Sequence, residues 1–71
     1  MQHAIKLRKV LDAMHKLGFG DVRQKGSHLF MEHPDGRTTV IPLHKEIKVG
    51  LLVKIIKKDL RMEVDVFFGL L

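Results

Sequence analysis

The chain has 71 residues, no cysteine, and a net charge of +5 from 13 Lys and Arg against 8 Asp and Glu. A chain of this length buries only about 60% of the surface that its unfolded form exposes, which excludes a deep substrate cavity. The absence of cysteine excludes disulfides and thiolate metal ligands within the chain and favours a reducing compartment. The positive charge is compatible with nucleic-acid binding, because cations displace counterions from phosphate, or with solubility alone.

The sequence contains no repeat, linker or low-complexity segment, so we expect a single domain over residues 1–71. No apolar run approaches the roughly 20 residues that a membrane span requires. The N-terminus alternates charged and apolar residues, unlike a signal peptide. We therefore expect a cytoplasmic protein without membrane contact.

The first predicted element is an amphipathic helix from His3 to Leu17. Its apolar residues fall within one arc of roughly 140° on a helical wheel, and Gly18 is a suitable helix end. The opposite face is mostly basic and includes Lys6 and Lys9. The residues of the apolar arc are Ala4, Leu7, Val10, Leu11, Met14 and Leu17.

Three extended segments follow. Asp21–Lys25 and Ser27–His33 are separated by Gly26, and the turn sequence His-Pro-Asp-Gly-Arg then leads into a β-branched strand over residues 37–42. Together they predict a three-stranded antiparallel meander. If Leu29 and Met31 face the helices, then His28, Phe30 and Glu32 face outward. Because Phe30 is the larger apolar group, we favour the alternative in which it is buried, with His28 at the start of the strand, near the sheet edge and still reachable.

The C-terminal part predicts a connection over residues 43–50 and a second helix from about Leu51 to Leu60. Its apolar stripe comprises Leu51, Leu52, Ile55, Ile56 and Leu60, opposite three lysines and Arg61. The tail, residues 62–71, is expected to form a helical turn or an extended cap in which Val64, Phe67 and Phe68 cover the core. The order α-β-β-β-α predicts an α+β fold with both helices on one face of the sheet and nothing in the chain on the other.

The sequence lacks the common catalytic, nucleotide-binding and metal-binding motifs. The carboxylates form no paired motif, and the phosphate-binding loop, the dinucleotide glycine pattern and the zinc-protease helix are absent, so we expect all eight to be ordinary solvated charges. His28 and His33 are an odd number of residues apart, which in a regular strand places them on opposite faces. We therefore expect no metal site and no cofactor. The eight carboxylates are Asp12, Asp21, Glu32, Asp35, Glu46, Asp59, Glu63 and Asp65.

His28 stands out because of its neighbours. Arg23 and Lys25 are suited to hold a phosphate, Gly26 allows close backbone approach, and Ser27 offers a hydroxyl and an N–H. Imidazole titrates near neutrality and can exchange a proton with a 2′-hydroxyl or a leaving 5′-oxygen. From the residues alone, His28 is either such a catalytic group or a surface histidine on a strand.

The motifs together resemble the HicA toxin family of mRNA interferases over roughly Leu11 to Leu60. The resemblance rests on a Gly-Ser-His triplet at 26–28, a His-Pro-Asp-Gly turn at 33–36, and a Pro-x-His segment at 42–44 followed by a helix. Where this family usually has Gly-Thr-Leu, the chain has Gly-Leu-Leu at 50–52, so a hydroxyl that caps the helix start is absent.

The resemblance implies a double-stranded-RNA-binding-domain-like fold and an endoribonuclease that cleaves mRNA, arrests growth and is neutralised by a HicB-like antitoxin. The active histidine of the family falls on His28, and His44 matches a family position as an auxiliary residue. Arg23, Lys25, Gly26, Ser27, Lys6 and Lys9 would then contact RNA. Two alternatives stay open: a non-catalytic RNA-binding module of the same fold, and a domain whose uncovered surface mainly binds a protein.

Overall fold

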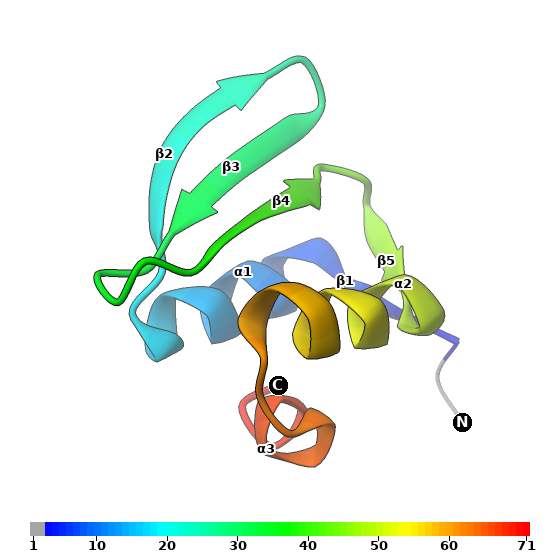
Figure 1. Ribbon diagram of the computed structural model, residues 1–71. Helices are drawn as coiled ribbons and strands as arrows, with labels where there is room; N and C mark the ends of the chain where they lie inside the picture. Colours follow the sequence, from blue (N-terminus) through cyan, green and yellow to red (C-terminus); the bar gives the residue numbers. More distant parts are fainter. Residues whose placement is uncertain (1–2) are drawn as a thin grey trace.

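The computed structural model describes residues 3–71, so residues 1 and 2 of the expected domain lie outside the described residues. The predicted α+β class and the α-β-β-β-α core with a three-stranded antiparallel sheet are confirmed, with a second small sheet and a final helix added (Figure 1). The elements in chain order are β1 (Ala4–Lys6), α1 (Leu7–Leu17), β2 (Gly20–Lys25), β3 (His28–Glu32), β4 (Thr38–Pro42), β5 (Glu46–Lys48), α2 (Val49–Ile55), the π-helical turn η1 (Ile56–Leu60) and α3 (Val64–Phe68).

The main sheet has the strand order β2-β3-β4, and α1 and α2 both lie beneath one of its faces (Figure 1). We call this covered face the inner face and the opposite one the outer face. Leu29 and Met31 of β3 and Ile41 of β4 are buried on the inner face, in one cluster with residues of both helices. The burial of these alternating side chains fixes the register of the strands.

Phe30 does not face the core, and this expectation was wrong. Leu29 and Met31 are 7% and 1% exposed, whereas Phe30 is only half-buried. Two apolar side chains on the inner face remove more surface from water than one phenylalanine, and they meet Ile41 and the buried Thr39 on the next strand. Since side chains alternate along a strand, His28 and Glu32 lie on the outer face with Phe30.

The first helix begins at Leu7, not at His3 as predicted. Residues Ala4–Lys6 instead form β1, which pairs antiparallel with β5 inside the segment predicted to be a plain connection. Ile5 and Ile47 face one another in this pair and are 4% and 1% exposed. The pairing satisfies backbone hydrogen-bonding groups and buries both isoleucines. This stabilisation outweighs the helical pattern that residues 4–6 show in the sequence.

The second helix begins at Val49 and continues through η1, which ends at Arg61 in the left-handed region with φ 53°. No side chain caps its start, but the Val49 N–H donates to the His3 carbonyl at 2.9 Å. Leu51, placed in the apolar stripe by the sequence, is 42% exposed. It belongs instead to the wall of a surface hollow described below.

The tail forms a helical turn, α3, as one of the two expected forms. Phe67 is completely buried and joins the core, while Val64 and Phe68 are half-buried against it. Within residues 3–71, no helix is both long enough and apolar enough to cross a membrane.

Candidate functional site

His28 is the first residue of β3 and follows a two-residue turn made by Gly26 and Ser27. Gly26 has φ 59°, a left-handed value that a two-residue hairpin turn accepts most easily from glycine at its first position. The Ser27 carbonyl accepts a hydrogen bond from the Leu43 N–H at 2.6 Å. His28 is paired with Lys25 on β2 and with Pro42 on β4, so the backbone beneath the imidazole is held on both sides.

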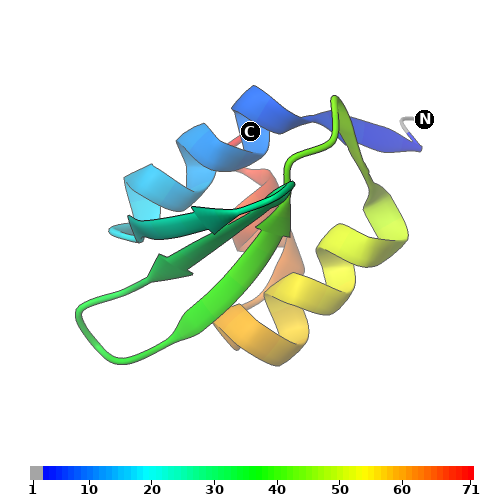
Figure 2. The same cartoon turned by 90° about the horizontal axis from the view of Figure 1, so that it is seen from above.

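A hollow of about 410 Å³ lies between the outer face of β4 and the helix formed by α2 and η1. Figure 2 shows α2 running alongside β4. His28, Lys54 and Lys58 all line this hollow, which we call the His28 hollow. Lys54 and Lys58 are four residues apart and therefore project from the same side of the helix. The other lining residues are Val40, Pro42, Leu51, Ile55 and Asp59.

Arg23 and Lys25 share the outer face with His28. Across β2 and β3, Lys25 lies opposite His28 and Arg23 lies opposite Phe30. The Arg23 guanidinium carbon is 4.8 Å from the centre of the Phe30 ring, a distance typical of a cation–π contact. Of the six residues expected to bind RNA, the turn residues Gly26 and Ser27 and these two cations are therefore grouped around His28.

The two remaining cations of the expected set lie elsewhere. Lys6 lines a separate hollow near the start of α1, together with Arg8, Lys45 and Glu46. Lys9 is an exposed residue of α1, the helix that lies beneath the inner face of the sheet (Figure 1). Neither lines the His28 hollow.

His44 follows two residues after Pro42 and is exposed. The hydrogen bonds, ion pairs and ring contacts of residues 3–71 include none between His28 and His44. Across the same range, no three His, Asp or Glu side chains come together as a possible metal site.

His33 has a structural position at the base of the β3–β4 turn. Its Nε2 lies 2.9 Å from the Leu17 carbonyl, and because a carbonyl only accepts, Nε2 carries the proton. The Nδ1 atom is then free to accept the Asp35 N–H at 3.1 Å. The ring also contacts Phe19 edge-on, with 5.1 Å between the centres. His33 thus joins the end of α1 to the turn, away from His28.

Three residues of the candidate site were not found from the sequence: Lys54, Lys58 and Asp59. The two lysines were recognised only as the wet side of a helix, although their spacing of four residues is a signal for a shared surface. Asp59 was expected to be a solvated charge, but it is half-buried and accepts a hydrogen bond from the Thr39 hydroxyl at 2.8 Å. Only the packing of η1 against β4 reveals this contact.

Comparison with known protein families identifies a matching family. Residues 7–60 of the 71-residue chain match the model of the family described as the HicA toxin of bacterial toxin-antitoxin systems. The chain belongs to the HicA toxin family. Its place in that family makes it a toxin of a toxin-antitoxin pair. No curated protein matches the chain.

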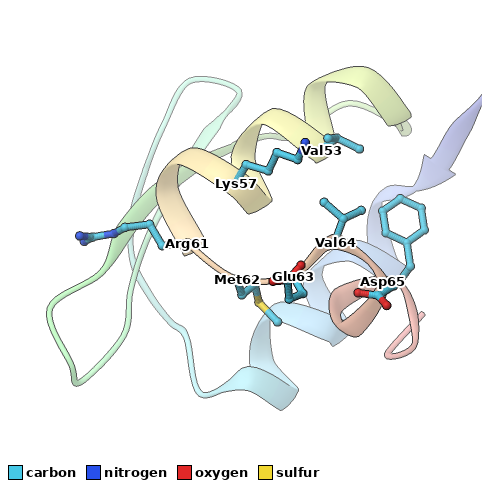
Figure 3. Close-up of a pocket in the computed structure, with 8 residues that line it drawn as sticks. Val53, Lys57, Arg61, Met62, Glu63, Val64 and Asp65 are labelled. Atoms are coloured by element: carbon cyan, nitrogen blue, oxygen red, sulfur yellow. The ribbon is translucent and has the colours of Figure 1, made fainter.

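A larger hollow, of about 1120 Å³, lies between the second helix and α3 (Figure 3). In this view Val64 points up toward the helix that carries Val53 and Lys57. No histidine lines it, and most of its lining residues follow residue 60, outside the part that matches the HicA family. We therefore place the candidate site at the smaller His28 hollow.

Proposed function

We propose that this HicA toxin is an endoribonuclease that cleaves mRNA with His28 as its proton-transfer group. The observation that carries the proposal is the grouping of His28 with Lys54 and Lys58 in one open hollow on the outer face of the sheet. An imidazole that shares a hollow with two ammonium groups is suited to a phosphodiester, because the cations hold the anion while the ring exchanges a proton.

In the proposed reaction, neutral His28 accepts the proton of an RNA 2′-hydroxyl. The 2′-oxygen attacks the adjacent phosphorus, and the bond from phosphorus to the 5′-oxygen breaks. Lys54 and Lys58 neutralise the negative charge that builds up on the phosphoryl oxygens, and the leaving 5′-oxygen takes a proton from one of these ammonium groups or from water. The products are a 2′,3′-cyclic phosphate and a 5′-hydroxyl end.

The surface around the His28 hollow is suited to a polynucleotide that binds across it from one side. Arg23 and Lys25 extend the positive surface from the hollow across β3 to β2. Single-stranded RNA would follow this path, with its phosphates at the lysines and the scissile bond at His28.

The direct test is to replace His28 by alanine and to measure RNA cleavage and growth arrest. We expect cleavage to fall by at least about 100-fold, the usual contribution of a general acid or base. His3→Ala is the matched control, because His3 is also exposed but lies outside the matched family region. Undiminished cleavage by a folded His28→Ala protein would refute the role of His28. RNA binding without cleavage by the wild type would instead support a non-catalytic binding module.

We further propose that a HicB-like antitoxin neutralises the toxin by covering His28 and the cations of the outer face. The support is that no segment of residues 3–71 packs over this face, which leaves it open to a partner (Figure 1). Co-purification with the product of the adjacent reading frame tests the pairing. If that protein binds and leaves His28 accessible to RNA, the proposed mode of neutralisation is wrong.

A further inference from the structure

We propose that a second hollow on the outer face, next to the His28 hollow, binds one unpaired RNA base that carries an exocyclic amino group. This hollow, which we call the base hollow, has a volume of about 510 Å³, within the range of about 300–1,000 Å³ typical of small-ligand sites. The inference rests on the proposed function, because it supplies the base contacts that the phosphate-binding cations lack.

The base hollow and the His28 hollow are adjacent. Val40, in the middle of β4, and Asp59, near the end of η1, line both of them. A nucleotide whose phosphate lies at His28 therefore has its base within reach of the second hollow. The remaining lining residues of the base hollow are Val22, Arg23, Phe30, Met31, Glu32, Thr38 and Thr39.

One wall of the base hollow is built for stacking. The Arg23 guanidinium carbon lies 4.8 Å from the centre of the Phe30 ring, so the two groups support one another above the sheet. Unpaired RNA bases stack on aromatic rings and on arginine planes. Val22 is 59% exposed beside this pair, at the point where the β2–β3 register shifts between Asp21 and Arg23. The shift in register explains why an apolar residue is turned outward here.

The opposite wall carries a hydrogen-bond acceptor in a fixed position. The Asp59 Oδ2 atom accepts the hydroxyl of the buried Thr39 at 2.8 Å, which orients the carboxylate. Among the described residues, none donates a hydrogen bond to its Oδ1. Asp59 lies in the π-helical turn η1, whose wider winding brings it against β4. A carboxylate accepts hydrogen bonds from the amino groups of cytosine, adenine or guanine, and uracil has no such group.

The two hollows differ in charge, so each favours a different part of a nucleotide. The His28 hollow contains Lys54 and Lys58 with one carboxylate, whereas the base hollow contains Asp59 and Glu32 with one cation, Arg23. Phosphate is attracted to the first and repelled by the carboxylates of the second. A neutral base with donor groups fits the second, which makes the orientation of the nucleotide specific.

The test measures binding to 2′-O-methyl hexanucleotides of uracil in which one position is guanine, adenine, cytosine, uracil or unsubstituted purine. These strands lack a free 2′-hydroxyl and stay intact, so binding is read independently of ribonuclease activity. We expect an amino-bearing base to bind about tenfold more tightly than uracil, as for one good base contact. Purine, which is adenine without its amino group, should lose that gain.

Three variants identify the groups that are responsible. Asp59→Asn keeps an acceptor for Thr39 but also presents donors to the base, so the preference over uracil should disappear. Asp12→Asn removes the same charge from the exposed side of α1 and should leave the preference unchanged. Phe30→Ala should weaken binding of every strand by about tenfold through loss of stacking. Thermal unfolding of each variant checks that it is folded.

Equal binding of all strands, or a preference that survives in Asp59→Asn, would overturn the inference. Unchanged affinity in folded Phe30→Ala would do the same for the stacking wall. A protein that shows the base preference but cleaves no unmodified RNA retains the base hollow and refutes only the ribonuclease activity. The two proposals can therefore fail separately.

Discussion

Two glycines with nearly the same φ differ in their surroundings. Gly18 ends α1 with φ 102°, and Gly36 lies in the β3–β4 turn with φ 99°. A Cβ atom on Gly18 would lie 3.0 Å from His33 Nε2, whereas one on Gly36 would meet nothing within 4 Å. The same atom of His33 donates to the Leu17 carbonyl. The absence of a side chain at Gly18 therefore also makes room for the histidine.

Alanine at each glycine should separate the two effects. Gly36→Ala is expected to cost about 1 kcal/mol of unfolding free energy through left-handed strain alone. Gly18→Ala carries the same strain and also displaces His33 from its hydrogen bond, which adds about 1 kcal/mol. Urea unfolding of both variants measures the difference. Equal losses of unfolding free energy would show that His33 moves aside without destabilising the fold.

Asp35 is the anionic residue of the β3–β4 turn. Its carboxylate accepts the Arg37 backbone N–H at 3.0 Å and the Arg37 side chain at 2.8 Å, and His33 Nδ1 lies 3.0 Å away. The backbone hydrogen bond from Arg37, followed by the side-chain hydrogen bond and charge of Arg37, holds the pKa of Asp35 below its ordinary value despite some desolvation. The folded state thus favours the ionised form.

This lowered pKa sets the direction of a pH effect. The carboxylate stabilises the fold fully above the ordinary pKa of aspartate, and the contribution disappears as pH falls through the lower folded value, that is, below about pH 4. Asp35→Asn should therefore be less stable than the wild type at neutral pH and should approach it in acid. Urea unfolding from pH 7 to pH 2.5 measures the gap, and a constant gap would contradict the assignment.

At the scale of elements, the second helix presents neighbouring lysines to different hollows. Lys58 lines the His28 hollow, and Lys57 lines the larger hollow next to α3. Neighbouring residues of a helix point in different directions, so two residues of equal charge serve as test and control. The proposed RNA path uses Lys58 and leaves Lys57 away from the phosphates.

The salt dependence of RNA binding distinguishes the two lysines. Each phosphate contact with a single strand contributes about 0.7 to the slope of log affinity against log salt concentration. Lys58→Ala should lower the slope by about that amount and weaken binding, whereas Lys57→Ala should change neither. Similar changes in both variants would mean that RNA is attracted by the overall charge of the helix.

For the molecule as a whole, apolar residues that repeat every two residues in strands and every 3.6 residues in helices were sufficient to predict the sheet and both helices. They failed where a contact distant in sequence decides the local structure. Ala4–Lys6 continues the helical pattern of α1, yet it pairs with Glu46–Lys48 some forty residues away. The size of Phe30 predicts that it is buried, but Leu29, Met31 and their partners on the opposite strand decide which side chains face the core.

The candidate site was predicted only in part, because some of its residues are brought together by contacts distant in sequence. Arg23, Lys25, Gly26 and Ser27 lie near His28 in the sequence, so their grouping with it was predicted. Lys54, Lys58 and Asp59 reach the outer face only because the second helix packs beside β4. Lys6 and Lys9 were included for their charge alone, and that charge lies at other parts of the surface.

The three-stranded sheet has one open edge. β4 is contacted by η1 through Thr39 and Asp59, but β2 lies at the other edge and all its residues are exposed. An unpaired edge strand invites a second copy to pair with it, and bulges and charged side chains are the usual protection. β2 has both, in the register shift before Arg23 and in the charge of Arg23 and Lys25. The cations proposed to bind RNA therefore also oppose aggregation, and variants that remove them must remain monodisperse before a loss of RNA binding is assigned to the site.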